Sequence, residues 1–381
     1  MTEVLVTAAE SAVPIHAILE TDLAAALDAA PPIARALAGV AEFKAKAGQI
    51  LVVPDPAGGA ERVLLGLGAE PVDPMILRGL APRLRSGDYR LVQAPQTLAP
   101  DMAALAFALG SYRFDRYKKK PAERPRLVVE PALAAEALSQ ARACALARDM
   151  VNTPANDLGP LQIETIAREI AEQFGARITT IIGEGLLEAN YPAVHAVGRA
   201  AVPERAPRMI EFDWGEAGRP LVALVGKGVV FDTGGLDIKP SSGMRLMKKD
   251  MGGAAHVLAL ARMIMAADLP VRLAVLIPVV ENAISGDAMR PGDVLASRKG
   301  LTIEVGNTDA EGRLILADAL ARAAELEPAL TIDMATLTGA ARAALGPQLP
   351  PYYTDDDALA GQIAAAADAV SDPLWRMPLW K

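Results

Sequence analysis

The sequence is poor in the side chains that build disulfides and soft metal sites. Cys144 is its one cysteine among 381 residues, so no disulfide can form within the chain and no cysteine-rich zinc or iron–sulfur site is available. Its three histidines, His16, His195 and His256, are far apart and show no HExxH spacing. A metal site must therefore rest mainly on aspartate and glutamate, and a Ser-His-Asp triad has few candidates for its base.

Long apolar runs and an excess of positive charge are also missing. The longest apolar stretches, such as 102–110 and 273–280, fall well short of the roughly 18 residues that a membrane span requires. The first twenty residues lack the basic segment that opens a signal peptide. A formal net charge of −8 disfavours nucleic acid as a partner, and the basic stretch 116–126 is predicted to be a solvated loop. We therefore expect a cytoplasmic chain without a membrane contact.

Hydrophobic residues are plentiful, at 52%, which is ample for a core. Over the first 130 residues short apolar runs alternate with alanine-rich helical stretches. The predicted strands are 50–54, 63–68 and 127–130, and the predicted helices are 75–84 and 101–109.

A long alanine-rich helix is predicted at 131–151, because Pro131 stands where a helix can begin and the turn-forming cluster 152–157 ends it. We expect it to link the two domains. Residues 152–381 then form a larger α/β domain with a mostly parallel central sheet. The predicted strands are 177–182, 208–214, 221–231, 271–280, 301–305 and 330–334, and the predicted helices are 161–174, 254–267 and 313–325.

Charged residues gather where the predicted strands of this domain meet helices. A glycine-rich turn carries Lys227, Asp232 and Lys239, a second segment carries Asp250, and NTDAEGRL at 307–314 carries three more charged residues. Ligand sites in such sheets lie beyond the carboxyl ends of the strands. We therefore expect the carboxylates to converge; the full set of charged candidates is Lys227, Asp232, Lys239, Asp250, Asp309, Glu311 and Arg313.

Four converging carboxylates need cations, because they cannot all stay ionised side by side. Two Mn²⁺, Mg²⁺ or Zn²⁺ ions about 3.5–4 Å apart would supply the charge and could bind a carbonyl, activate water and hold an amine. The lysines could stabilise an oxyanion or, once deprotonated, bind a metal. Each acidic residue by itself is more often a surface charge or a helix cap. The residues alone therefore leave a dinuclear metal hydrolase and unrelated structural roles both open.

Several segments together resemble the leucine aminopeptidase family, the M17 cytosol aminopeptidases. NTDAEGRL, VGKGVVFDTGG, DIKPSSGM, MKKDMGGAAHVL, ENAISGDAMRPGDVL, DMATLTGA and NTPAND follow the family order, from about residue 141 to the end of the chain. The resemblance implies an N-terminal α/β domain at 1–130, a linker helix at 131–151 and a catalytic domain from 152. Family members continue past the segment resembling 375–379, which implies a catalytic domain cut short at Lys381.

The resemblance also implies roles for individual residues. Asp232 and Glu311 would bridge two divalent ions, Lys227 and Asp250 would complete the tighter site, and Asp309 the looser one. The residues matched to metal ligands are thus Lys227, Asp232, Asp250, Asp309 and Glu311.

Other matched residues would act on the substrate. Lys239 would polarise the scissile carbonyl, and Arg313 would hold a bicarbonate that serves as general base while a metal-bound hydroxide attacks. Met247, Thr336 and Gly339 match the pocket for the N-terminal side chain, and Leu337 matches a backbone contact to the substrate. Asp237, an extra carboxylate beside Lys239, is predicted to point to solvent.

The function implied is a metal-dependent aminopeptidase with a leucine-type preference, acting on peptides. Its cofactors would be two ions per subunit, Mn²⁺ or Zn²⁺ with Mg²⁺ or Co²⁺ as alternatives, and bicarbonate. The assembly implied is a hexamer, a dimer of trimers. A DNA-binding role, an inactive paralogue and a two-metal phosphoesterase are the alternatives, and the charge of −8 and the complete motif set disfavour them.

Overall fold

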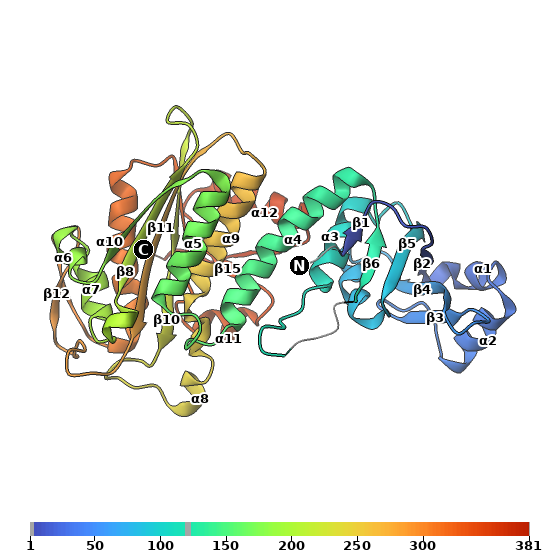
Figure 1. Cartoon of the computed structure of the whole chain (residues 1–381), viewed down its shortest axis with the longest axis horizontal. Helices are drawn as coiled ribbons and strands as arrows, with labels where there is room; N and C mark the ends of the chain where they lie inside the picture. The colour runs from blue at the N-terminus through green and yellow to red at the C-terminus, as the bar shows by residue number, and fades with distance from the viewer. Residues whose placement is uncertain (1–3, 119–122, 381) are drawn as a thin grey trace. The chain divides into compact units, whose positions relative to one another are not determined.

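A computed structural model describes residues 4–118 and 123–380 of the chain. The elements group into two compact α/β units, one comprising Met1–Ala145 with Gly339–Lys381 and the other Leu146–Thr338 (Figure 1). The helix α4 (Pro131–Asn152) runs from the first unit into the second and has the bounds predicted for the linker to within one residue.

The first unit is built on a six-stranded sheet in the order β1-β6-β5-β2-β4-β3. Pairing is parallel except between β3 and β4, which are antiparallel. One face packs on α3 and α4 through residues such as Phe107 and Ala141, and the other face meets α1 and α2 around Ile18 and Leu64. The bounds are β1 Leu5–Val6, β2 Val13–Leu19, β3 Ile50–Pro54, β4 Ala60–Gly68, β5 Gly87–Gln93, β6 Pro125–Val128, α1 Leu23–Asp28, α2 Pro32–Val40 and α3 Pro100–Gly110.

Two predictions for this unit need correction. The helix predicted at 75–84 is a pair of short 3-10 turns, Ile76–Gly79 and Ala81–Arg83, because Pro82 has no N–H to continue an α-helix. The basic stretch 116–126 was predicted to be a loop throughout, but β6 begins at Pro125 and pairs with β5. Residues 119–122 of that stretch lie outside the described part of the chain.

The last segment of the chain contributes two helices and a small parallel sheet to the first unit. Helix α12 begins at Asp356, whose side chain accepts the Leu359 N–H (2.9 Å), as expected of a helix-capping aspartate. The bounds are α11 Ala340–Leu345, β15 Pro351–Tyr352, α12 Asp357–Ala369 and β16 Trp375–Arg376.

The second unit has a mixed central sheet in the order β14-β9-β11-β8-β7, and β10 also pairs with β11. The half formed by β14, β9, β10 and β11 is parallel, whereas β8 and β7 are antiparallel to their neighbours. The bounds are β7 Arg177–Ile182, β8 Arg208–Trp214, β9 Leu221–Gly226, β10 Gly228–Asp232, β11 Arg272–Asn282 and β14 Leu330–Met334.

Helices cover both faces of this sheet (Figure 1). Val194 of α7 and Ile315 of α10 share one hydrophobic core cluster with Val225 of β9 and cover one face of the sheet, while α5 and α9 contact the other. The result is a three-layer α/β domain, and the predicted fold class is confirmed. The bounds are α5 Pro160–Phe174, α6 Gly185–Glu188, α7 Pro192–Gly198, α8 Ser241–Met244, α9 Gly252–Ala266 and α10 Glu311–Glu325, with 3-10 turns η5 Met247–Met251 and η6 Thr308–Ala310.

Two strand predictions differ from the structure of this unit. The strand predicted at 221–231 is interrupted at Lys227, whose N–H donates to Met334 O (3.0 Å) and whose carbonyl accepts the Ala254 N–H (2.8 Å). The strand predicted at 301–305 is β13 (Thr302–Glu304), which pairs with β12 (Val294–Ala296) in a separate antiparallel ribbon. An apolar run of this length does not reveal which strand it will pair with.

A buried ion pair joins α5 to β8. Glu164 lies 2.5 Å from Arg208 and 2.7 Å from Arg168, and Glu164 and Arg208 are both buried. Burial alone would raise the pKa of Glu164, but the hydrogen bonds from Arg168 and Arg208 outweigh it and the pKa is lowered. We expect Glu164→Gln to lower the free energy of unfolding by about 3–5 kcal/mol at pH 7, because Arg208 keeps a buried charge without its carboxylate.

Urea unfolding of both proteins would measure this difference, with the exposed Glu169→Gln on the same helix as control. Because the native pKa of Glu164 lies below its unfolded value, the carboxylate stabilises the fold above that unfolded value, about pH 4.3. The stabilisation is lost as the pH falls through the lowered native pKa, so the two unfolding curves should converge in acid. Equal stability at pH 7 would contradict the assignment.

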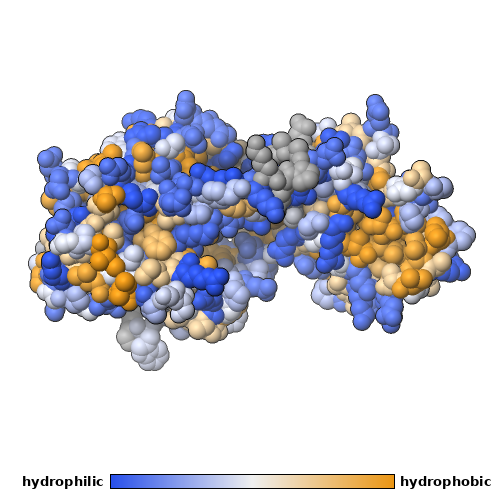
Figure 2. Space-filling model, turned by 60° about the horizontal axis from the view of Figure 1, so that its bottom comes forward, coloured by the Kyte–Doolittle hydropathy of each residue, from blue (hydrophilic) through white to orange (hydrophobic). Residues whose placement is uncertain are grey.

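Hydrophilic side chains alternate with separate apolar patches on the face in Figure 2. None of the helices within 4–118 and 123–380 is long and apolar enough to cross a bilayer. This agrees with the short apolar runs in the sequence.

Candidate metal centre

The charged candidates lie at the carboxyl ends of the parallel strands in the second unit. Lys227 directly follows β9, Asp232 ends β10, and Asp250 is carried by η5. Asp309 lies on η6 and Glu311 opens α10. These are the strand ends at which open α/β sheets place their ligands.

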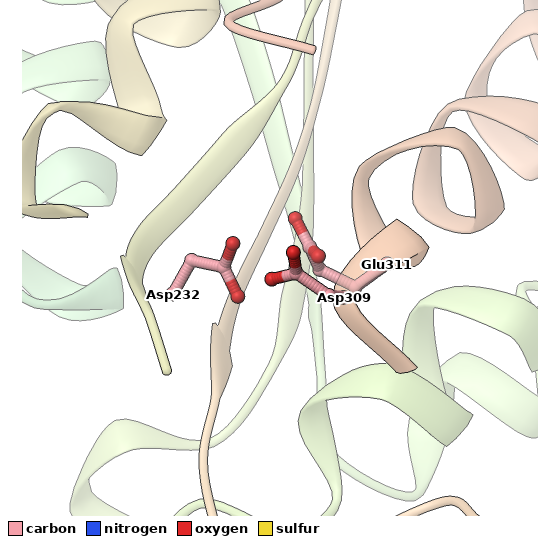
Figure 3. Close-up of side chains that lie close together, drawn as sticks. All are labelled: Asp232, Asp309 and Glu311. Atoms are coloured by element: carbon pink, nitrogen blue, oxygen red, sulfur yellow. The ribbon is translucent and has the colours of Figure 1, made fainter. Parts of the chain in front are cut away.

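Three carboxylates come together here. Asp232, Asp309 and Glu311 each offer an oxygen, and these oxygens lie within 4.8 Å of one another. In Figure 3 the Asp232 carboxylate extends from the end of β10 toward those of Asp309 and Glu311, which project from the turn and helix opposite. Asp232 and Glu311 are buried, whereas Asp309 is partly exposed.

Lys227 connects Asp250 to this cluster. Its ammonium Nζ lies 2.6 Å from Asp250 Oδ2 and 3.0 Å from Glu311 Oε1, and all three side chains are buried. Burial would lower the pKa of Lys227, but the charges of Glu311 and Asp250 outweigh it and the pKa is raised. Lys227 is thus an ammonium in this structure, and it must lose a proton before it can ligate a metal.

Lys239 pairs with the other two carboxylates. Its Nζ lies 2.9 Å from Asp232 Oδ2 and contacts Asp309 Oδ1. Burial acts to lower the pKa of Lys239, but hydrogen bonds to Asp309 and Asp232 raise it overall. The side chain is 14% exposed, so Lys239 is less deeply buried than Lys227.

The environment of the buried Glu311 carboxylate indicates whether the site suits a cation. Burial raises its pKa, Lys227 opposes this, and Asp232 and Asp250 add to it, giving a pKa of about 7. Its Oε2 is buried without a hydrogen-bond partner among the described residues. A buried, unsatisfied carboxylate oxygen beside a second carboxylate is costly unless a cation compensates it. The donor set of Asp232, Asp309 and Glu311, with Asp250 beside Lys227, therefore fits hard divalent ions.

Two residues that the sequence analysis did not select hold this cluster in place. Asn282, which ends β11, donates from Nδ2 to Asp232 Oδ1 (2.8 Å) and to Thr308 O (3.1 Å). Thr308 is fully buried and directly precedes Asp309. A polar residue at the carboxyl end of a long apolar strand was the available signal for Asn282.

The prediction that Asp237 points to solvent is only partly right, because it missed a hydrogen bond that the side chain forms. Although the residue as a whole is exposed, its carboxylate Oδ2 accepts the Thr308 N–H at 2.7 Å. The Asp237 N–H in turn donates to Thr308 Oγ1 (2.8 Å). The partner lies 71 residues along the chain, so no local pattern could reveal it.

The remaining candidates are the predicted substrate-binding residues and Arg313, which have fewer contacts with the carboxylate cluster. Thr336 Oγ1 donates to Asp250 Oδ1 (2.8 Å), so the loop after β14 meets η5, where Met247 is half-buried. Leu337 is exposed, and Gly339 caps α11. Arg313 lies in the first turn of α10, is exposed, and within the described residues forms no ion pair with the four carboxylates.

Comparisons with known proteins agree on one family. The model of the cytosol aminopeptidase family catalytic domain matches residues 145–381, and that of the M17 aminopeptidase N-terminal domain matches 13–130. A probable cytosol aminopeptidase of Roseiflexus castenholzii is 39% identical over 372 residues, 89% of this chain and 76% of the relative.

The fold of this chain is also similar to solved structures. The crystal structure of a cytosol aminopeptidase from Coxiella burnetii superposes with a TM-score of 0.91 at 43% identity, over 99% of this chain and 82% of that one. The bottromycin maturation enzyme BotP, in complex with Mn, superposes with a TM-score of 0.85 at 34% identity, over 97% and 82% of the two chains.

Proposed function

Since this chain belongs to the cytosol aminopeptidase family, M17, and is thus a metal-dependent aminopeptidase, we propose that it releases N-terminal amino acids from peptides, with a preference for leucine. The reaction would take place at the centre formed by Asp232, Asp309 and Glu311. The observation that carries the assignment is the buried Glu311 carboxylate, with a pKa of about 7 and an unsatisfied oxygen, in a cluster of three carboxylates. Such a group suits a divalent cation.

Five residues would hold two divalent ions. Asp232 and Glu311 would be shared between the ions, Lys227 and Asp250 would complete the tighter site, and Asp309 would complete the looser one. When bound, the ions supply Lewis acidity and an activated water. We propose Mn²⁺ or Zn²⁺, with Mg²⁺ and Co²⁺ as alternatives; the Mn complex of the related BotP supports manganese.

The side chains of the chain itself orient the peptide. Asp250, with its carboxylate held by Lys227 and Thr336, would receive the free α-amine of the substrate. Lys239 would direct its ammonium group at the scissile carbonyl oxygen and stabilise the negative charge that develops there. A requirement for a free amine at this position restricts cleavage to the N-terminal residue of a peptide.

Arg313 would hold a bicarbonate, which would supply a general base to the site. Its exposed guanidinium in the first turn of α10, two residues after Glu311, offers paired N–H donors to a small planar anion. Met247, Thr336 and Gly339 would shape the pocket for the N-terminal side chain, and Leu337 would contact the substrate backbone. The half-buried thioether of Met247, on the same turn as Asp250, favours an apolar side chain.

We propose further that the chain works as a cytoplasmic hexamer, a dimer of trimers, and that it divides into an N-terminal domain at 1–130, a linker helix at 131–151 and a catalytic domain from 152. The family models, which match 13–130 and 145–381, support that division. Sedimentation of the metal-loaded protein tests the assembly, and a monomer at micromolar concentration would contradict it.

Metal removal tests the proposed function directly. We expect a chelator to lower hydrolysis of leucine p-nitroanilide about 100-fold and added Mn²⁺ to restore it, because the ions activate the water and polarise the carbonyl. N-acetyl-leucine p-nitroanilide should stay intact under the same conditions, since it lacks the free amine. Hydrolysis that survives chelation, or that is equally fast on the acetylated substrate, would refute the proposal.

A further inference from the structure

Two short segments carry the side chains that meet across the centre. The loop 233–239 leaves β10 and ends at Lys239, and the turn 307–310 carries Asp309. Lys239 contacts Asp309, so the position of its ammonium group depends on how these two backbone segments are held together. The Lys239 N–H closes the loop by donating to Thr233 O at 2.9 Å.

The pair formed by Asp237 and Thr308 joins the two segments. Asp237 Oδ2 accepts the Thr308 N–H (2.7 Å), and the Asp237 N–H donates to Thr308 Oγ1 (2.8 Å). The Thr308 hydroxyl then donates to Gly234 O at 2.6 Å. Asp237 is two residues before Lys239 and Thr308 one residue before Asp309, so the bonds lie next to the functional side chains on both segments.

The packing of this loop leaves no room for adjustment. Gly234 and Gly235 adopt φ values of +89° and +66°, and a Cβ on Gly234 would lie 2.5 Å from Asp237 O. A Cβ on Gly235 would lie 2.9 Å from Thr308 Oγ1. The loop therefore lies directly on the turn, and the hydrogen bonds between them join the backbone that carries Lys239 to the backbone that carries Asp309.

We propose that Asp237 is a positioning residue: by accepting the Thr308 N–H it holds the loop 233–239 on the turn 307–310 and thereby fixes the Lys239 ammonium group beside Asp309, where the substrate carbonyl would bind. The inference rests on the proposed function. What Asp237 contributes is a hydrogen-bond acceptor at one point, so an amide side chain of the same length can replace it.

Kinetics of two variants test the role. We expect Asp237→Ala to lower kcat on leucine p-nitroanilide about 10–30-fold, with KM within about threefold, because a small displacement of a catalytic ammonium group costs rate more than binding. Asp237→Asn should keep at least about a third of the wild-type kcat, since its side-chain oxygen can accept the same N–H. Metal content should stay at the wild-type value in both variants. Asp287→Ala, at an exposed aspartate after β11, is the control.

Amide hydrogen exchange gives a readout that does not depend on activity. Exchange of the Thr308 amide should be faster in Asp237→Ala and unchanged in Asp237→Asn. An active wild type with an unaffected Asp237→Ala, an equal loss of kcat in both variants, or unaltered Thr308 exchange would each overturn the inference. A wild-type protein without metal-dependent turnover would instead overturn the proposed function.

Discussion

Glu311→Gln is expected to lower metal-dependent turnover by at least about 1000-fold, equivalent to roughly 4 kcal/mol of transition-state stabilisation. Glutamine keeps the volume of the side chain but removes the charge of a proposed bridging ligand. Measurement of bound Mn²⁺ alongside kcat/KM would show whether the loss lies in metal retention. Added Mn²⁺ should not restore the rate.

The fold should tolerate this substitution. Burial raises the pKa of the Glu311 carboxyl to about 7, so an uncharged amide is better tolerated at this position than at an ordinary exposed glutamate. The metal-free variant should therefore melt at or above the wild-type temperature. Glu304→Gln, on the exposed ribbon strand β13, is the matched control. A Glu311→Gln enzyme with more than a tenth of wild-type activity would refute the proposed centre.

Lys239→Met is expected to lower kcat about 100- to 1000-fold, the usual cost of losing one donor to a developing oxyanion. Methionine retains the length and the apolar stem of lysine, so packing in the loop is largely preserved. KM should change little, because the ammonium group is proposed to act mainly in the transition state.

Metal analysis separates this loss from damage to the centre. Lys239 pairs with Asp232 and Asp309, so its removal leaves the negative charge of these carboxylates uncompensated. The amount of bound Mn²⁺ should therefore stay the same or increase. Lys299→Met, at an exposed loop position, should behave as wild type. A Lys239→Met enzyme with normal kcat, or one that has lost its metal, would contradict the role proposed for Lys239.

Strands and helices with strong local patterns were predictable. The runs at 177–182 and 208–214 are strands with the predicted bounds, because β-branched side chains fill most of the first and Ile210, Phe212 and Trp214 alternate with other residues along the second. Where the outcome depended on distant partners, prediction failed. The strand is interrupted at Lys227 because the backbone of this residue hydrogen-bonds to Met334 and Ala254. The strand β13 pairs with β12 and does not join the central sheet.

For the candidate centre, too, the sequence predicted which residues take part but not which side chains they contact. The charged residues could be selected because they follow apolar strands, and the structure brings Asp232, Asp309 and Glu311 within reach of one another. The pairing of each lysine with two carboxylates could not be predicted, since sequence spacing does not say which oxygen an ammonium group will contact. The hydrogen bond between Asp237 and Thr308 was missed for the same reason, because Thr308 belongs to a turn 71 residues further along the chain.

The ion pairs that the two lysines form bear on the order in which the chain folds and binds metal. Lys227 and Lys239 each pair with two carboxylates and offset part of their negative charge with charge that the chain itself supplies. We therefore expect the catalytic domain to fold before any ion binds, unlike small zinc domains that remain unfolded until loaded. Metal binding would then replace the internal ammonium groups beside the carboxylates, and a limited metal supply would lower the fraction of active molecules without lowering the fraction of folded ones.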